Sequence, residues 1–144
     1  MSFELHPRLA ADTDLVGDLP LCRVLLAKEN IGPWLVLVPR RPSLREVHHL
    51  PEPAQIELMR ESATVASLLE TTYGADKINI AALGNMVPQL HVHHVARFEG
   101  DAAWPRPIWG NTPGTLRDAD AQAALLERLR EQLAAYPGFV PARA

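Results

Sequence analysis

Apolar residues recur at two spacings along the chain, and each spacing predicts a different kind of element. Between residues 52 and 72 they return every three or four positions, which is the period of an amphipathic helix, and Gly74 follows as its end. Residues 118–135 repeat this period and predict a second helix. The helical regions are therefore well separated in the sequence.

Short apolar or alternating runs predict strands between and before the helices. Residues 22–27 and 34–38 are two such runs, and the turn-forming residues that separate them predict an antiparallel hairpin. Residues 77–83 predict a further strand, and 88–98 alternate with a period of two. The order strand, strand, helix, strand, strand, helix favours an α+β fold with an antiparallel sheet and helices on one face.

Composition limits the class of protein. The 144 residues suffice for one domain with a real core, and 47% hydrophobic and 22% charged residues are typical of a globular chain. The net charge of −3 gives no basic surplus, so a bound nucleotide is expected to be small rather than polymeric. Neither a signal-like start nor a run of about 18 apolar residues occurs, so we expect a cytoplasmic protein with no membrane span.

Cys22 is the only cysteine, which rules out an intramolecular disulfide and a cysteine-based zinc site. It lies in the apolar run 19–27, and we interpret it as a buried core thiol.

Half of the six histidines lie within four positions of the alternating run. On a strand, Gln89, His91, His93 and Arg97 point to one face, and His94 points to the other. Two imidazoles beside an amide and a guanidinium suit phosphate chemistry or a metal ion.

The metal hypothesis uses His91 and His93 as half of a site. Such a site needs a third ligand. The spacing does not choose between the candidates, which are His48, His49 and Glu99.

The phosphate hypothesis makes one imidazole a nucleophile towards phosphorus, because a neutral imidazole is abundant near pH 7. Its other ring nitrogen needs an acceptor, and a second histidine can donate to phosphate oxygens. Gln89 can hold the departing group, and the turn 84–88 offers backbone N–H groups to phosphate.

The run 89–97, with Asn79, Gly84 and Asn85 ahead of it, resembles the signature of the histidine triad (HIT) superfamily of nucleotide hydrolases and transferases. The family motif is His-φ-His-φ-His-φ-φ, often followed by Pro-Arg. The order of the elements over about 19–98 also agrees with the family.

When the motif is aligned on Arg97, His91 matches the middle, nucleophilic histidine of the family and His93 the third. Gln89 takes the position of the first histidine. His94 replaces an apolar residue of the motif, and we interpret it as a structural or interface residue.

The resemblance implies a HIT-like fold: an antiparallel sheet of about five strands, with a long helix and a C-terminal helix packed on it. It implies a single domain over residues 1–144, with a core of about 14–100 and a Trp/Pro loop and helix over 101–144.

The activity that it implies is nucleotide phosphohydrolysis or nucleotidyl transfer, on a dinucleoside polyphosphate, a nucleotide phosphoramidate or a related conjugate. His91 would attack the α-phosphorus and form a nucleotidyl-histidine, with His93 and Gln89 assisting. The scheme needs no cofactor and no metal held by the protein, although Mg²⁺ could accompany a polyphosphate substrate.

The resemblance also implies a set of substrate-binding residues, namely Asn79, Gly84, Asn85, Glu29 and Arg97. The ribose-binding residue stays open between Glu29 and Asn30. A homodimer with joined sheets is expected, in which residues 104–110 either approach the partner's site or form a rigid Pro-rich loop.

Two other functions remain open from the sequence. One is a nucleotide-binding or sensing protein without turnover, and the other is a metal-binding protein built on His91 and His93.

Overall fold

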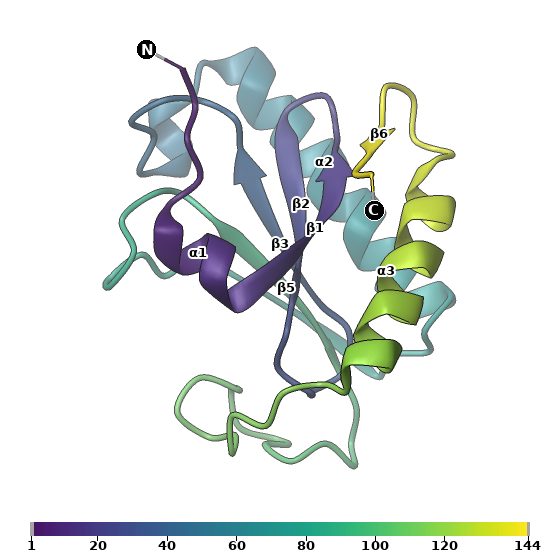
Figure 1. Ribbon diagram of the computed structural model, residues 1–144. Helices are drawn as coiled ribbons and strands as arrows, with labels where there is room; N and C mark the ends of the chain where they lie inside the picture. Colours follow the sequence, from purple (N-terminus) through teal and green to yellow (C-terminus); the bar gives the residue numbers. More distant parts are fainter. Residues whose placement is uncertain (1, 144) are drawn as a thin grey trace.

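The computed structural model describes residues 2–143 and contains a six-stranded, fully antiparallel sheet with the strand order β4-β5-β3-β2-β1-β6 (Figure 1). The strands are β1 (Thr13–Asp18), β2 (Cys22–Ala27), β3 (Trp34–Pro39), β4 (Lys77–Ala81), β5 (Val92–Arg97) and β6 (Val140–Pro141). The helices are α1 (Pro7–Asp12), the short 3₁₀ helix η1 (Val47–His49), α2 (Glu52–Thr71) and α3 (Ala119–Leu133).

The α+β class, both long helices and the β2–β3 hairpin are confirmed. The sheet has one strand more than the expected number of about five, and α1, β1 and β6 were not expected. Pairing with β2 shifts register between Leu15 and Gly17, so β1 lacks a clean period of two. Gly17 itself is required by close packing, because a Cβ there would lie 2.5 Å from the carbonyl oxygen of Val140 on β6.

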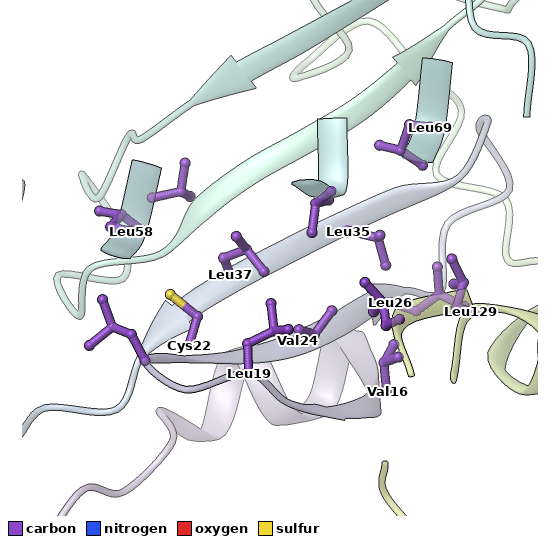
Figure 2. Packing of buried hydrophobic residues seen from close by; sticks show 14 of the residues in the cluster. Val16, Leu19, Cys22, Val24, Leu26, Leu35, Leu37, Leu58, Leu69 and Leu129 are labelled. Atoms are coloured by element: carbon purple, nitrogen blue, oxygen red, sulfur yellow. The ribbon is translucent and has the colours of Figure 1, made fainter. Parts of the chain in front are cut away.

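The sheet is covered on both faces, by different elements. Figure 1 shows α1 in front of the sheet and α2 behind it, with α3 at one side. The main core fills the space between the sheet, α2 and α3, and Figure 2 shows its leucine and valine side chains converging there. A smaller cluster lies on the opposite face, where Leu9 of α1 packs with Val36, Val38 and Val87.

Cys22 lies in the main core, as expected, and burial raises the pKa of its thiol well above the usual range (Figure 2). Next to Cys22, α2 contributes the fully buried carboxylate of Glu61, which accepts hydrogen bonds from the backbone N–H groups of Leu21 and Cys22, at 2.8 Å each. Burial and a hydrogen bond with Glu57 raise the pKa of Glu61. This carboxylate joins α2 to the start of β2.

The motif strand is shorter than the alternating run predicts. Pairing with β3 stops at Val92, which lies opposite Leu37, and the N–H of Leu90 donates to the oxygen of Leu44 in the loop after β3. Gln89 and His91 therefore precede β5, so the alternation of a strand does not govern where Gln89 points.

Among residues 2–143, no helix has both the length and the apolar character that crossing a membrane requires.

Candidate functional site

A pocket of about 710 Å³ opens on the face of the sheet that carries α1. Its wall is formed by parts of α1, β2, β3, the turn before the motif, both motif histidines and the loop after β5. The residues are Arg8, Leu9, Ala11, Asp12, Thr13, Ala27, Lys28, Glu29, Trp34, Val36, Leu83, Gly84, Asn85, Met86, Val87, His91, His93, Trp109, Gly114 and Leu116.

His91 is held in one tautomer by the backbone. Its Nδ1 lies 2.7 Å from the carbonyl oxygen of Gln89, and since a carbonyl can only accept, Nδ1 carries the proton. In the neutral ring, Nε2 therefore keeps its lone pair. His91 is 7% exposed and lines the pocket. The side chain that carries this lone pair is therefore part of the pocket wall, where a ligand can contact it.

His93 has the opposite arrangement. The indole N–H of Trp34 donates to Nδ1 of His93 at 3.1 Å, so in the neutral ring the proton lies on Nε2. Burial, with smaller contributions from the charges of His91 and His94, lowers the pKa of His93 to about 4. The ring centroids of His91 and His93 are 4.9 Å apart. The pair thus presents a nitrogen lone pair beside a neutral N–H donor.

Two tryptophans enclose His93. The Trp109 ring lies 5.1 Å from the His93 ring and 6.3 Å from the Trp34 ring, perpendicular to it. Trp109 comes from the 104–110 segment and lies in the pocket of its own chain. Neither tryptophan was predicted to contact His93. The pairing of β3 with β5 would have predicted the position of Trp34. Trp34 lies opposite Val95, so its side chain is on the face of the sheet that carries His93.

Three of the predicted substrate-binding residues lie at this pocket. Gly84, in the left-handed region at φ 79°, and the exposed Asn85 form the turn beside the histidines. Glu29 follows β2 and accepts a hydrogen bond from the hydroxyl of Thr112 at 2.6 Å. Of the two candidates for the ribose, Glu29 lines the pocket and Asn30 does not.

Arg97 and Asn79 are occupied elsewhere. Arg97 is 2% exposed, pairs through Nε with Asp101 at 2.8 Å and donates to Oδ1 of Asn79 at 2.7 Å. Hydrogen bonds from Arg97 lower the pKa of Asp101 to about 2. These contacts join β4, β5 and the following loop, and neither Arg97 nor Asn79 lines the pocket.

Gln89 is also outside the pocket. Its side-chain amide donates to the carbonyl oxygen of Glu4 at 2.8 Å and accepts from the N–H of His6 at 2.8 Å. The amide that the sequence placed at the leaving group is therefore bound to the N-terminal segment instead.

His94 points away from the pocket, as expected from the alternation. Its Nδ1 donates to the oxygen of Val92 at 3.0 Å, and its Nε2 accepts from the hydroxyl of Ser62 on α2 at 2.7 Å. Burial lowers the pKa of His94 to about 4. Both ring nitrogens are satisfied inside the core, which makes His94 a structural residue.

Nothing in residues 2–143 completes a metal site on His91 and His93. No group of three His, Cys, Asp or Glu side chains in that range is placed to hold a metal ion. The exposed His48 and His49 stack on each other in η1, with ring centroids 4.5 Å apart, and Glu99 is also exposed.

The chain is similar to known proteins in both sequence and fold. The model of the HIT domain family matches residues 8–100. A histidine triad protein from Bradyrhizobium japonicum is 48% identical, with 92% of this chain and 98% of that chain covered and a TM-score of 0.88. One from Marinobacter aquaeolei is 44% identical, with 94% and 99% covered and a TM-score of 0.90.

A hypothetical histidine triad nucleotide-binding protein from Sulfolobus tokodaii shares the fold at 18% identity, with 85% of this chain and 84% of that chain covered and a TM-score of 0.65. The comparison with curated proteins finds no match.

Proposed function

Because this chain belongs to the histidine triad family, we propose that it is a nucleotide hydrolase or nucleotidyl transferase that acts through a covalent nucleotidyl-histidine on His91. The observation that carries the proposal is the 2.7 Å hydrogen bond from Nδ1 of His91 to the oxygen of Gln89. It keeps the lone pair on Nε2, and an imidazole with a free lone pair in a pocket is a competent nucleophile.

The proposed reaction has two steps. In the first, Nε2 of His91 attacks the α-phosphorus of a nucleotide conjugate, and the N–P bond forms. The bond from phosphorus to the leaving oxygen or nitrogen breaks, and a leaving nitrogen takes up a proton from the medium. In the second, water attacks the same phosphorus, and the N–P bond breaks. One water proton goes to the medium, and the imidazole is restored in its original tautomer. A second acceptor in place of water would give nucleotidyl transfer.

The neighbouring groups supply what this chemistry needs. The Nε2–H of His93 donates to the negative charge that develops on phosphate oxygens, and the backbone of Gly84 and Asn85 offers further donors. Glu29 is the group proposed to bind the ribose hydroxyls. With a pKa of about 4, His93 remains a neutral donor throughout the neutral range.

Intact-protein mass spectrometry with a nucleoside phosphoramidate or a dinucleoside polyphosphate tests the proposal. We expect wild-type protein to gain the mass of one nucleoside monophosphate and His91→Asn to gain none. His49→Asn, which changes an exposed histidine, is the matched control and should label as wild type does.

Chelation of divalent ions should leave adduct formation from a phosphoramidate unchanged, because no protein-held metal takes part. Wild-type protein that binds nucleotides without adduct or turnover would make it a non-catalytic nucleotide-binding protein. Loss of activity on chelation would favour the metal-binding alternative.

We also propose that two copies join through β4. This strand lies at the edge of the sheet, and the side chain of Ile80 on it is 52% exposed. A free strand edge beside an apolar side chain suits pairing with a second copy. Sedimentation should show a dimer for wild type and a monomer for Ile80→Lys. A cytoplasmic location stays a prediction from the sequence.

A further inference from the structure

The N-terminal segment, residues 2–6, is fastened to the motif by a single side chain. Gln89 donates from Nε2 to the oxygen of Glu4, and its Oε1 accepts from the N–H of His6, both at 2.8 Å. A side-chain amide can make this pair of bonds, because its carbonyl carbon carries both an N–H donor and an oxygen acceptor. The two bonded backbone groups lie more than 80 residues away in sequence.

The fastened segment leads directly into α1. The ring of His6 caps this helix, since its Nδ1 accepts from the N–H of Arg8 at 3.1 Å. One turn later, Leu9 is buried against Val36 and Val87, which also line the pocket. The position of His6 therefore sets the position of the helix that forms one wall of the pocket.

The other end of α1 is held independently. The hydroxyl of Thr13 donates to the oxygen of Leu9 at 2.6 Å, and Nζ of Lys28 donates to the oxygen of Ala11 at 3.1 Å. Because Thr13 begins β1, the C-terminal end of α1 is part of the sheet. The N-terminal end is held by packing of Phe3 and Leu5 against the cluster around Leu9 and by the two hydrogen bonds to Gln89. Those two bonds are the polar contacts that fix residues 4–6 beside the motif.

We propose that Gln89 is a positioning residue, which latches residues 4–6 so that α1 closes the pocket around its ligand, and not a group that acts on the reacting atoms. The segment also brings Arg8 to the pocket, and among residues 2–143 this guanidinium has no ion-pair partner. Because Arg8 lies on the wall that α1 forms, we expect the bound ligand to be anionic and to carry a phosphate group. In this respect the inference rests on the proposed function.

Gln89→Met keeps the length of the side chain and removes both hydrogen bonds. Its matched control is Gln55→Met, which removes a similar half-buried bond, from Nε2 of Gln55 to the oxygen of Leu50, at the start of α2. A third variant lacks residues 2–6. The double variant combines this deletion with Gln89→Met.

The first measurement is amide hydrogen exchange and needs no ligand. We expect the amide of His6 and those of α1 to exchange about tenfold faster in Gln89→Met, because each of the two lost hydrogen bonds contributes a factor of roughly threefold. Gln55→Met should leave them unchanged. Equal exchange in wild type and Gln89→Met would overturn the latch.

The second measurement is binding of adenosine monophosphate, followed by the fluorescence of Trp34 and Trp109. We expect Gln89→Met to raise Kd about tenfold, because only the latched fraction binds well. Deletion of residues 2–6 should raise Kd at least as much, because the packing of Phe3 and Leu5 is lost as well. Adding Gln89→Met to the deletion should raise Kd no further. Arg8→Gln should also weaken binding of the monophosphate more than binding of adenosine. Additive effects of the deletion and Gln89→Met would contradict the proposal.

The third measurement is the rate of adduct formation on His91 at saturating phosphoramidate. A positioning role raises KM and leaves the saturated rate within about twofold of wild type. A fall of a hundredfold or more at saturation, with exchange at His6 unchanged, would assign Gln89 to the chemistry instead. If wild type forms no adduct, the proposed function fails, while the exchange result still decides the latch.

Discussion

His93 and His94 are adjacent in sequence, both buried and both with pKa values lowered to about 4, yet they occupy opposite faces of β5. His94 has both ring nitrogens bonded, to Ser62 and to the oxygen of Val92. His93 has one nitrogen bonded to Trp34, and its ring lines the pocket. Burial and a lowered pKa therefore do not separate a functional histidine from a structural one. What separates them is whether the second ring nitrogen is bonded within the protein, as in His94, or left for a ligand in the pocket, as in His93.

His93→Ala tests the functional half of this comparison and has the largest expected effect. Removing a preorganised donor beside the reacting phosphate should lower kcat by roughly 10²- to 10³-fold. Steady-state turnover of a phosphoramidate measures it, with His49→Ala as control. Unchanged turnover would remove His93 from the mechanism. The free energy of unfolding should fall less than for a change at His94, because only the bond from Trp34 is lost.

His94→Leu tests the structural half. The leucine leaves the Ser62 hydroxyl and the Val92 oxygen without their partner, which should cost about 2–3 kcal/mol of unfolding free energy. Urea denaturation at pH 7 measures the change. The saturated rate per folded molecule should stay near that of wild type. A loss of rate without a loss of stability would reverse the assignment of the two histidines.

The pH dependence of stability follows from the lowered pKa of His94. The folded protein binds this proton only near pH 4, whereas the unfolded chain binds it below about pH 6.5. Between these values the unfolded chain holds more protons, so His94 makes wild type less stable as the pH falls. The loss of unfolding free energy caused by His94→Leu should therefore be smaller at pH 5 than at pH 7, by up to about 2 kcal/mol.

The quantity to measure is the difference in unfolding free energy between wild type and His94→Leu. The raised pKa of Glu61 acts in the opposite direction, since the folded protein then holds the extra proton and loses stability as the pH rises. This contribution is common to wild type and variant and cancels in the difference. A cost of His94→Leu that is independent of pH would contradict the buried, neutral state of His94.

Trp34→Phe gives the smallest expected effect and sharpens the comparison most. It keeps an aromatic ring against His93 and removes the N–H that selects the tautomer. We expect about a tenfold loss of kcat/KM, since the Nε2–H form is no longer imposed. Nitrogen-15 chemical shifts of His93 should show a mixture of tautomers in the variant, and those of His94 should not change.

Much of the fold follows from local pattern. The period of α2 and α3, the β2–β3 hairpin and the opposite orientation of His93 and His94 were all predicted from neighbouring residues. The N-terminal elements were not, because α1 has six residues and the register of β1 shifts between Leu15 and Gly17. Short or irregular elements gain their stability from packing, which local pattern does not report.

The site divides in the same way. The sequence by itself determined that His94 points away from His93, because alternation along a strand is a property of the backbone. It also predicted that His91 and His93 act together, and both line the pocket although His91 precedes β5. Only the tertiary structure decided that Gln89 binds the N-terminal segment and that Arg97 binds Asp101. It also decided that Trp34 selects the tautomer of His93. A buried amide, guanidinium or imidazole takes the partner that the folded chain brings within reach, and the fold places many of those partners far away in sequence.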